Sequence, residues 1–339
     1  MIDLSANENP LGPSPRVADA IAAGLRRLHR YPDKDGSELK GLLAHKFGVE
    51  AGQIALGNGS CEIIDLAARA YLALGCEAIL ADPSFLPYQS AVERARSRKV
   101  MVPLRDHHHD FEAMLDHLNS RTRLIIIGNP NNPTGTTADR RALEQFLDRI
   151  PDHVLMFLDE AYFEYVQRED FPAALDYVAQ GRSVLVSRSL SKAYGLAGLR
   201  LGYAIAPVRV TRQIEAMRQH YNVNSLAQVA AGAALKDEWH LRRCIAHNSA
   251  ARSYLQREIA ALGLECPRSE ANFLLVRVGN GEEARRLLEQ RGIVVKGMSG
   301  FGLPEHIRVS VGRDEDNEYF IEALRAICRS GRQAARGDV

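Results

Sequence analysis

Lys192 is the side chain best suited to form a covalent bond with a small molecule. It lies in a hydroxyl-rich segment, residues 187–200, which directly follows the apolar run 184–186. A lysine amine can form a Schiff base with an aldehyde, while hydroxyl groups and the guanidinium of Arg200 can bind a phosphate. The segment therefore suits a ligand that carries both an aldehyde and a phosphate. The alternative is a solvated surface lysine, as most lysines are.

A carboxylate upstream extends this chemistry. Asp159 follows a second apolar run, residues 154–158, and Glu160 comes next. Pyridoxal 5'-phosphate carries an aldehyde, a phosphate and a ring nitrogen, and a carboxylate against that nitrogen keeps it protonated. The two segments together favour pyridoxal 5'-phosphate as the cofactor. Taken alone, Asp159 could equally cap a helix or form a salt bridge.

Seven short segments resemble, in the same order, those of the fold-type-I pyridoxal-phosphate aminotransferases of class I/II. Within that group the chain is most similar to the histidinol-phosphate aminotransferases, over nearly its whole length. The segments are residues 7–10, 30–32, 57–60, 83–85, 129–135, 187–200 and 307–312. The resemblance implies a transaminase that forms a homodimer with shared active sites.

The resemblance also assigns individual residues to the cofactor. Lys192 would hold it and shuttle a proton, and Asp159 would pair with its ring nitrogen. Tyr162 and Asn132 would donate to its phenolic oxygen, although Asn132 also lies in an ordinary turn sequence. Residues 57–61 lead into a predicted helix whose first N–H groups can face an anion. Further cofactor contacts are implied for Ser60, Cys61, Ser189, Ser191, Arg200, the ring-stacking Phe85 and, from the partner subunit, Tyr31.

Substrate contacts are implied in the same way. Arg308 matches an arginine that binds a substrate carboxylate through a bidentate fork, and Asn272 and Asn7 match active-site asparagines. The chain departs from the histidinol-phosphate pattern at Lys296, where those relatives carry an arginine for the substrate phosphate. An ammonium group binds phosphate as a point charge rather than as a fork. The chain also begins almost directly at residues 7–10, without the longer arm that helps to close the substrate site.

The expected reaction is a ping-pong transfer of an amino group between a small-molecule amino donor and a 2-oxo acid acceptor. L-Histidinol phosphate and 2-oxoglutarate are the predicted pair, and aromatic or other amino acids are the alternative donors. A decarboxylase of the threonine-phosphate type would use the same lysine, aspartate and phosphate site, so these residues do not separate the two classes. The presence of Lys192 argues against a non-catalytic relative.

Strand and helix patterns alternate through the first two thirds of the chain. Short runs that are apolar throughout predict strands buried on both faces. The runs are residues 54–56, 78–80, 100–102, 124–127, 154–158, 184–186 and 201–205. With helical periodicity between several of them, they predict an α/β fold with a three-layer large domain and a mostly parallel mixed sheet. The candidate chemistry falls where these strands end, as expected for ligands of open α/β sheets.

A smaller α+β domain is predicted after the sheet. The pattern reads as long helix from about residue 208 to 262, and a last helix runs from 314 to about 329. Between them, strands are predicted at residues 272–278, 292–296 and 306–311. We expect an N-terminal segment 1–30, a large cofactor-binding domain 31–235, a small domain 236–330 and a frayed tail 331–339.

Composition argues against several classes of function. The chain has 339 residues, 46% hydrophobic and 25% charged, with a formal net charge of +1. This balance gives no electrostatic basis for binding nucleic acid or membranes, and no apolar run approaches the roughly 20 residues of a membrane span. The five scattered cysteines and the absence of a signal-peptide pattern predict a cytoplasmic protein with unpaired thiols. Residues 107–109 are consecutive histidines, which rarely meet at one metal ion, so we expect a solvated loop and no metal.

Overall fold

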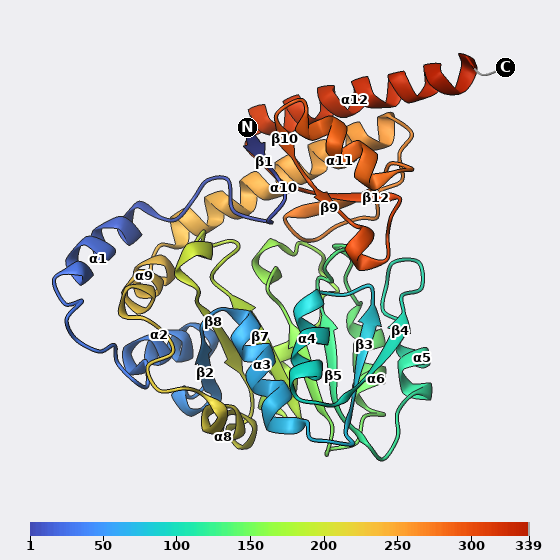
Figure 1. The fold of residues 1–339 in the computed structure, drawn as a ribbon. Helices are drawn as coiled ribbons and strands as arrows, with labels where there is room; N and C mark the ends of the chain where they lie inside the picture. Colours follow the sequence, from blue (N-terminus) through green and yellow to red (C-terminus); the bar gives the residue numbers. More distant parts are fainter. Residues whose placement is uncertain (338–339) are drawn as a thin grey trace.

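The computed structural model describes residues 1–337, with side chains for residues 1–329, and contains one large sheet and two small ones (Figure 1). The large sheet has the strand order β2-β8-β7-β6-β5-β3-β4. Its strands are β2 (Ile54–Gly57), β3 (Glu77–Asp82), β4 (Arg98–Pro103), β5 (Thr122–Gly128), β6 (Leu155–Asp159), β7 (Val184–Ser189) and β8 (Gly202–Ile205). Strand β8 runs antiparallel to both neighbours, and the other neighbouring pairs are parallel. The predicted mostly parallel mixed sheet is therefore confirmed.

Both faces of this sheet are buried. On β5, Ile125 and Ile127 belong to one hydrophobic core, while Leu124 and Ile126 belong to the core on the opposite face. Because side chains alternate across a strand, a strand covered on both faces is apolar throughout.

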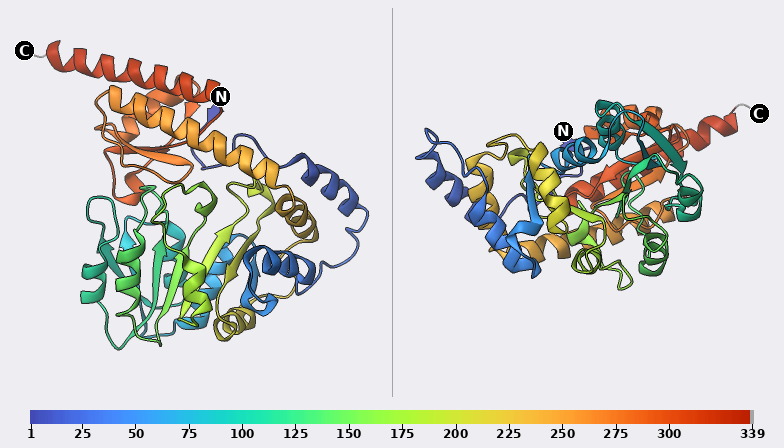
Figure 2. Two further views of the ribbon diagram at one scale, coloured as in Figure 1. Left: turned by 180° about the vertical axis from the view of Figure 1, so that it is seen from behind. Right: turned by 90° about the horizontal axis from the view of Figure 1, so that it is seen from below.

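Helices form the two outer layers (Figure 2). One face is covered by α2 (Ser37–Phe47), α5 (Phe111–Asp116), α6 (Arg140–Leu147), α7 (Ala174–Ala179) and α9 (Ser225–Leu235). The other face is covered by α3 (Ser60–Tyr71), α4 (Leu86–Arg94) and α8 (Val208–Met217). Short 3-10 helices lie in the connections, as η1 (Ala51–Gln53), η2 (Phe163–Tyr165), η3 (Ala197–Leu199) and η4 (Ser299–Phe301).

The smaller α+β domain packs on the edge of the large sheet where the candidate site residues lie (Figure 1). Its three-stranded antiparallel sheet has the order β11-β12-β9. The strands are β9 (Phe273–Arg277), β11 (Lys296–Gly297) and β12 (His306–Ser310), and the helices are α10 (Glu238–Ala261), α11 (Gly281–Glu289) and α12 (Asp314–Gly337). Helix α12 continues to Gly337, whereas the frayed tail was predicted to begin at residue 331. Residues 338–339 lie outside the described part.

The predicted strand 292–296 is wrong as a single element. It forms two short strands in different sheets, β10 (Ile293–Val294) and β11. Ile293 and Val295 both pack in the core of the small domain, and the chain changes its hydrogen-bonding partner between them. Strand β10 pairs with β1 (Ile2–Asp3), so the start of the chain is joined to the small domain.

The single long helix expected from residue 208 to 262 is also wrong, because three helices occupy this stretch. The side chain of Asn224 caps α9 by accepting from the N–H of Ala227, at 2.8 Å. Asp237 caps α10 by accepting from the N–H of His240, at 3.1 Å. Such caps satisfy the N–H groups that the first turn of a helix leaves unpaired, and so mark where new helices begin. Helix α1 (Pro15–Leu25) then packs against α9.

Candidate active site

The carboxyl ends of β5, β6 and β7 lie next to one another because these parallel strands are neighbours in the sheet. Loop 129–137 follows β5, Asp159 ends β6, and Lys192 follows β7. A cavity of about 280 Å³ opens above them, between the large sheet and the small domain. Of the predicted site residues, it is lined by Asn7, Ser60, Phe85, Asn132, Asp159, Tyr162, Lys192, Lys296 and Arg308.

Lys192 points into this cavity from the turn after β7. Its ammonium group donates to the backbone carbonyls of Asn7, at 3.0 Å, and Ala6, at 3.4 Å. Burial lowers the pKa of Lys192 to about 8, and the nearby positive charge of Arg308 acts in the same direction. A larger fraction of this amine is therefore neutral near pH 7 than for a solvated lysine, as a nucleophilic amine requires.

Asp159 is buried at the floor of the cavity. Its Oδ2 accepts from the hydroxyl of Tyr88, at 2.8 Å, and its Oδ1 accepts from the N–H of Ala161, at 3.2 Å. Burial raises the pKa of Asp159 to about 6, and the hydrogen bond from Tyr88 opposes that rise. Tyr88 is not among the residues predicted for the site. Its only signal in the sequence is a position one helical turn after Phe85, just outside segment 83–85.

Glu160, the neighbouring acid, has a different environment. Its Oε2 accepts from the Nε and Nη2 atoms of Arg188, at 2.9 Å and 2.8 Å, and both side chains are buried. The guanidinium of Arg188 also lies 3.6 Å from the ring centroid of Phe163. Glu160 is therefore held in a buried ion pair and does not line the cavity.

A polar cluster forms one wall of the cavity. The hydroxyl of Tyr162 accepts from the amide groups of Asn7, at 3.1 Å, and Asn132, at 3.4 Å. Asn132 in turn accepts from Nη1 of Arg308, at 2.6 Å. The cluster joins the N-terminal segment, the loop after β5 and strand β12. It therefore fixes an asparagine amide, a phenol and a guanidinium on one side of Lys192.

The residues of the predicted phosphate site come together where the loop before α3 packs against β8. Gly59 has φ +81°, and a Cβ added to it would lie 2.6 Å from Nη2 of Arg200. A Cβ added to Gly202 would lie 2.5 Å from the backbone nitrogen of Ser60, so glycine is required for this close approach. Cys61 and Ser60 occupy the first turn of α3, whose free N–H groups can face an anion.

Two serines complete this region. The Oγ of Ser189 accepts from the N–H of Ser191, at 3.1 Å. The Oγ of Ser191 is buried and has no hydrogen-bond partner among the described residues. Buried hydroxyl groups are normally hydrogen-bonded, so a phosphate at this point would satisfy an otherwise unpaired group. The residues present therefore fit pyridoxal 5'-phosphate, because an amine and a buried carboxylate line one cavity and the residues predicted to bind the phosphate lie beside Ser60 in its lining.

Two cations from the small domain face the same cavity. Lys296 on β11 and Arg308 on β12 are directly opposite in the antiparallel ladder, and both line the cavity. Lys296 is exposed, whereas Arg308 is buried and donates through Nη2 to the carbonyl of Ser5, at 2.9 Å. The Nε of Arg308 has no partner among the described residues. The pair thus provides one deep and one peripheral positive charge.

Two predicted residues lie elsewhere. Asn272 does not line the cavity; its amide donates to the carbonyls of Asn7, at 3.0 Å, and Glu8, at 3.2 Å, and so holds the N-terminal segment. Tyr31 is 82% exposed, away from the cavity of its own chain, and stacks on Tyr221 with ring centroids 4.8 Å apart.

The three consecutive histidines of the predicted loop make separate contacts. His109 is not solvated as expected, because its Nε2 bonds to the carbonyl of Gly128, at 2.9 Å, and burial lowers its pKa to about 4. Within the described residues, no group of three or more histidine, cysteine or acidic side chains could hold a metal ion. Among residues 1–337, no helix is both long and apolar enough to cross a bilayer.

The mostly parallel sheet, the small α+β domain and the lysine–aspartate pair at adjoining strand ends define a fold-type-I pyridoxal-phosphate-dependent transaminase. The chain belongs to the family of aminotransferases class I and II, whose family model matches residues 1–324.

Individual relatives agree with this assignment. The chain is 44% identical over 326 residues to histidinol-phosphate aminotransferase 2 of Pseudomonas aeruginosa, covering 96% of this chain and 88% of that protein. It is 43% identical over 329 residues to the histidinol-phosphate aminotransferase of Moorella thermoacetica, covering 96% and 85%. Among solved structures, the histidinol-phosphate aminotransferase of Sinorhizobium meliloti in complex with pyridoxal-5'-phosphate is similar, with a TM-score of 0.89 and 28% identity, covering 97% of this chain and 91% of that chain.

Proposed function

We propose that this aminotransferase uses L-histidinol phosphate as amino donor and 2-oxoglutarate as acceptor. The observation that carries the proposal is the cation pair Lys296 and Arg308, which faces the same cavity as Lys192. A phosphate dianion needs more positive charge than a single carboxylate. In a ping-pong reaction both substrates use one site in turn, so the same pair would bind the phosphate of the donor and a carboxylate of the acceptor.

Bound pyridoxal 5'-phosphate would supply an electron sink for the bond broken at the substrate Cα. The proposed roles of the residues follow from their positions. Lys192 would hold the cofactor and then, as a free amine, remove and return the Cα proton. Asp159 would hold a proton on the ring nitrogen, and Tyr162 with Asn132 would hydrogen-bond the phenolic oxygen.

The proposed cofactor phosphate site combines backbone and side-chain donors. The N–H groups of Ser60 and Cys61 open α3, and Arg200 lies against Gly59. Ser189 and Ser191 would add hydroxyl groups, and Phe85 would cover the ring. Binding the phosphate with a helix N-terminus and a guanidinium fixes the cofactor before the chemistry begins.

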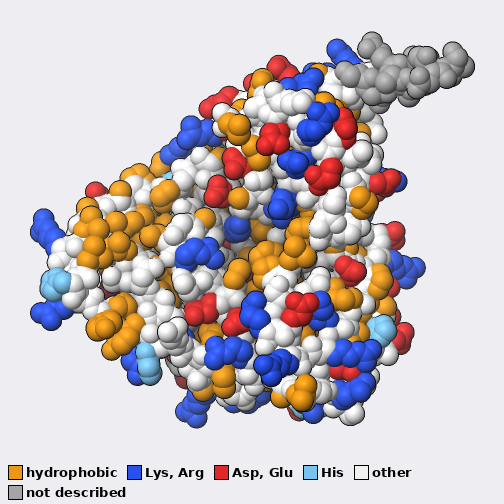
Figure 3. All heavy atoms as spheres, in the orientation of Figure 1, with side chains coloured by type: hydrophobic (Ala, Val, Ile, Leu, Met, Phe, Trp, Pro, Cys, Tyr) orange, Lys and Arg blue, Asp and Glu red, His pale blue; other side chains and the backbone are white. Residues whose placement is uncertain are grey.

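We also propose that the enzyme is a homodimer in which Tyr31 reaches the partner subunit's cofactor phosphate. Exposed apolar side chains gather over α1 and α9 (Figure 3). They include Leu25, Leu28 and Val229, each more than 40% exposed. Such a patch is typical of a surface that another protein covers.

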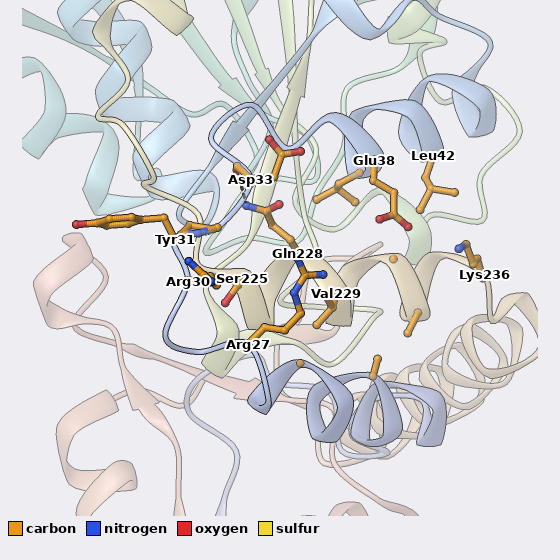
Figure 4. A pocket seen from close by; sticks show the side chains of 16 residues that line it. Arg27, Arg30, Tyr31, Asp33, Glu38, Leu42, Ser225, Gln228, Val229 and Lys236 are labelled. Atoms are coloured by element: carbon orange, nitrogen blue, oxygen red, sulfur yellow. Dashed lines mark hydrogen bonds between the residues drawn. The ribbon is translucent and has the colours of Figure 1, made fainter.

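A second cavity beside this patch supports the dimer. It has a volume of about 500 Å³ and lies between α1, α2 and α9, with Tyr31 at its rim (Figure 4). Basic and acidic side chains, among them Arg27, Glu38 and Lys236, line it together with Leu42. Its mixed lining suits the polar and apolar side chains of a second copy of this chain better than a small apolar ligand.

The chain would work as two domains, with residues 31–235 binding the cofactor and residues 236–330 carrying the substrate cations. The first 30 residues would form a segment that joins the two. Supporting this, β1 pairs with β10 of the small domain, while α1 packs on α9 of the large one.

A half-reaction screen tests the proposed function. Cofactor-loaded protein is mixed with single amines, and conversion of the cofactor absorbance to that of pyridoxamine phosphate is recorded. L-Histidinol phosphate should convert the cofactor fully, and added 2-oxoglutarate should restore the original spectrum. Carbon dioxide release from O-phosphothreonine, without conversion of the cofactor, would instead identify a decarboxylase. The L-threonine-O-3-phosphate decarboxylase of Porphyromonas gingivalis has the same fold, with a TM-score of 0.84 and 24% identity.

A further inference from the structure

Tyr88 makes a buried hydrogen bond that hydrophobic packing does not require. It is 2% exposed on α4, and its hydroxyl donates to Oδ2 of Asp159, at 2.8 Å. Gly128 on β5 lies opposite Asp159 in the sheet, and a Cβ added there would come within 3.1 Å of the Tyr88 hydroxyl. The missing side chain at Gly128 therefore leaves room for the hydroxyl to reach the carboxylate. A phenylalanine at position 88 would fill the same space in the core without this contact.

We propose that Tyr88 is a positioning residue of the reaction, whose hydrogen bond weakens the basicity of Asp159. The proton that Asp159 shares with the ring nitrogen of the cofactor therefore stays on that nitrogen. The inference rests on the proposed function, in which Asp159 faces that nitrogen. A carboxylate that already accepts a hydrogen bond has a lower proton affinity. A proton between a carboxylate and a pyridine nitrogen goes to the stronger base. Without Tyr88 the pair therefore shifts toward a neutral acid and a neutral ring, which accepts electrons less well.

Burial and the hydrogen bond from Tyr88 act on the ionisation of Asp159 in opposite directions. Burial favours the protonated acid and raises the pKa of Asp159 to about 6. The hydrogen bond from Tyr88 is the largest influence in the opposite direction, followed by the N–H of Ala161. Burial also raises the pKa of the Tyr88 phenol well above its ordinary value, so the hydroxyl remains a donor. Glu160 and Lys192 also interact electrostatically with Asp159, and so do Cys61 and Tyr162.

The test compares Tyr88→Phe with wild type, and uses Tyr71→Phe as a matched control. Tyr71 lies on α3, and its hydroxyl is buried without a hydrogen-bond partner among the described residues. Each protein is loaded with pyridoxal phosphate labelled with ¹⁵N in the ring, and the ¹⁵N chemical shift reports whether the ring nitrogen carries a proton. In the cofactor-free proteins, ¹³C-carboxyl spectra follow the titration of Asp159, whose signal is identified by its loss in Asp159→Asn. Circular dichroism and cofactor stoichiometry establish that each variant is folded.

In Tyr88→Phe the ring ¹⁵N signal should move toward the unprotonated position, and the Asp159 carboxyl should titrate at higher pH than in wild type. The loss of one hydrogen bond to a charged group predicts a fall in kcat of about ten- to a hundredfold, with KM for the amino donor changed less than about twofold. Tyr71→Phe should match wild type in all three measurements. An unchanged ¹⁵N shift, or an unchanged Asp159 titration, in Tyr88→Phe would overturn the inference. A wild-type protein that binds no cofactor at Lys192 would refute the proposed function itself, while the Asp159 titration would still decide whether Tyr88 tunes the carboxylate.

Discussion

The reactivity of Lys192 depends on its surroundings more than on its side-chain type. Burial and the charge of Arg308 lower the pKa of Lys192 to about 8. An amine with a lowered pKa is neutral above that pH and protonated below it, and the neutral form is the nucleophile. The rate at which cofactor-free protein captures pyridoxal phosphate should therefore rise with pH through about 8 and level off above it.

Stopped-flow absorbance at the cofactor band gives this pH profile. Borohydride reduction and peptide mapping should find the cofactor on Lys192, and Lys192→Ala should retain bound cofactor but lose the covalent link and turnover. A capture rate with its midpoint near the ordinary lysine pKa of about 10.4 would contradict the lowered pKa. Cofactor mapped to a different lysine would refute the central assignment.

At the scale of single elements, β6 ends in Asp159 and Glu160 follows directly, so two adjacent acids have separate environments. Asp159 faces the cavity, whereas Glu160 pairs with Arg188 in the protein interior. Asp159→Asn should remain as stable as wild type, because burial already disfavours the charged form, yet it should lose most of its kcat. Glu160→Gln should instead lose about 3–5 kcal/mol of unfolding free energy, because Arg188 is left buried without its partner charge.

Urea unfolding and steady-state kinetics on the two variants separate these outcomes, and each variant is the control for the other. Near-normal kcat in Asp159→Asn would mean that another group holds the ring nitrogen. Unchanged stability in Glu160→Gln would mean that the buried ion pair contributes little to the fold.

The hairpin of β11 and β12 would form the proposed substrate anion site, since it sets Lys296 directly opposite Arg308. If histidinol phosphate is the donor, Lys296→Ala should raise its KM by about ten- to a hundredfold, as expected for one lost charge-assisted contact. KM for a donor with a carboxylate in place of the phosphate should rise much less. Lys296→Arg is the matched control and should preserve or improve use of histidinol phosphate.

Arg308→Ala should impair the use of every substrate, because this guanidinium lies deeper in the cavity than Lys296 and also holds Asn132. Equal insensitivity of all KM values to both alanine substitutions would mean that the substrate anion binds elsewhere.

At the scale of the whole molecule, the proposed dimer makes each active site depend on two chains. Inactive Lys192→Ala is mixed with a Tyr31→Ala variant, dissociated and allowed to reassociate. If Tyr31 acts across the interface, each heterodimer contains one intact site, because the Tyr31→Ala chain retains Lys192 and receives Tyr31 from its partner. Random reassociation should then restore about a quarter of wild-type activity.

The same mixture contains no intact site if Tyr31 serves its own chain, so no recovery despite proven subunit exchange would contradict the shared site. Each variant dissociated and reassociated alone gives the background activity.

The sequence by itself determined the family, the cofactor chemistry and the strands of the large sheet. Local features carry these properties: apolar runs that need two covered faces, and the residues that follow them at strand ends. The resemblance assigned the ring nitrogen to Asp159, but only the tertiary structure showed what Glu160 does, because its ion pair depends on Arg188 from the neighbouring strand. It also showed that Tyr88 donates to Asp159, that residues 292–296 are divided between two sheets, and that Asn272 contacts the N-terminal backbone. Each of these depends on contacts between residues distant in sequence, which no local pattern contains.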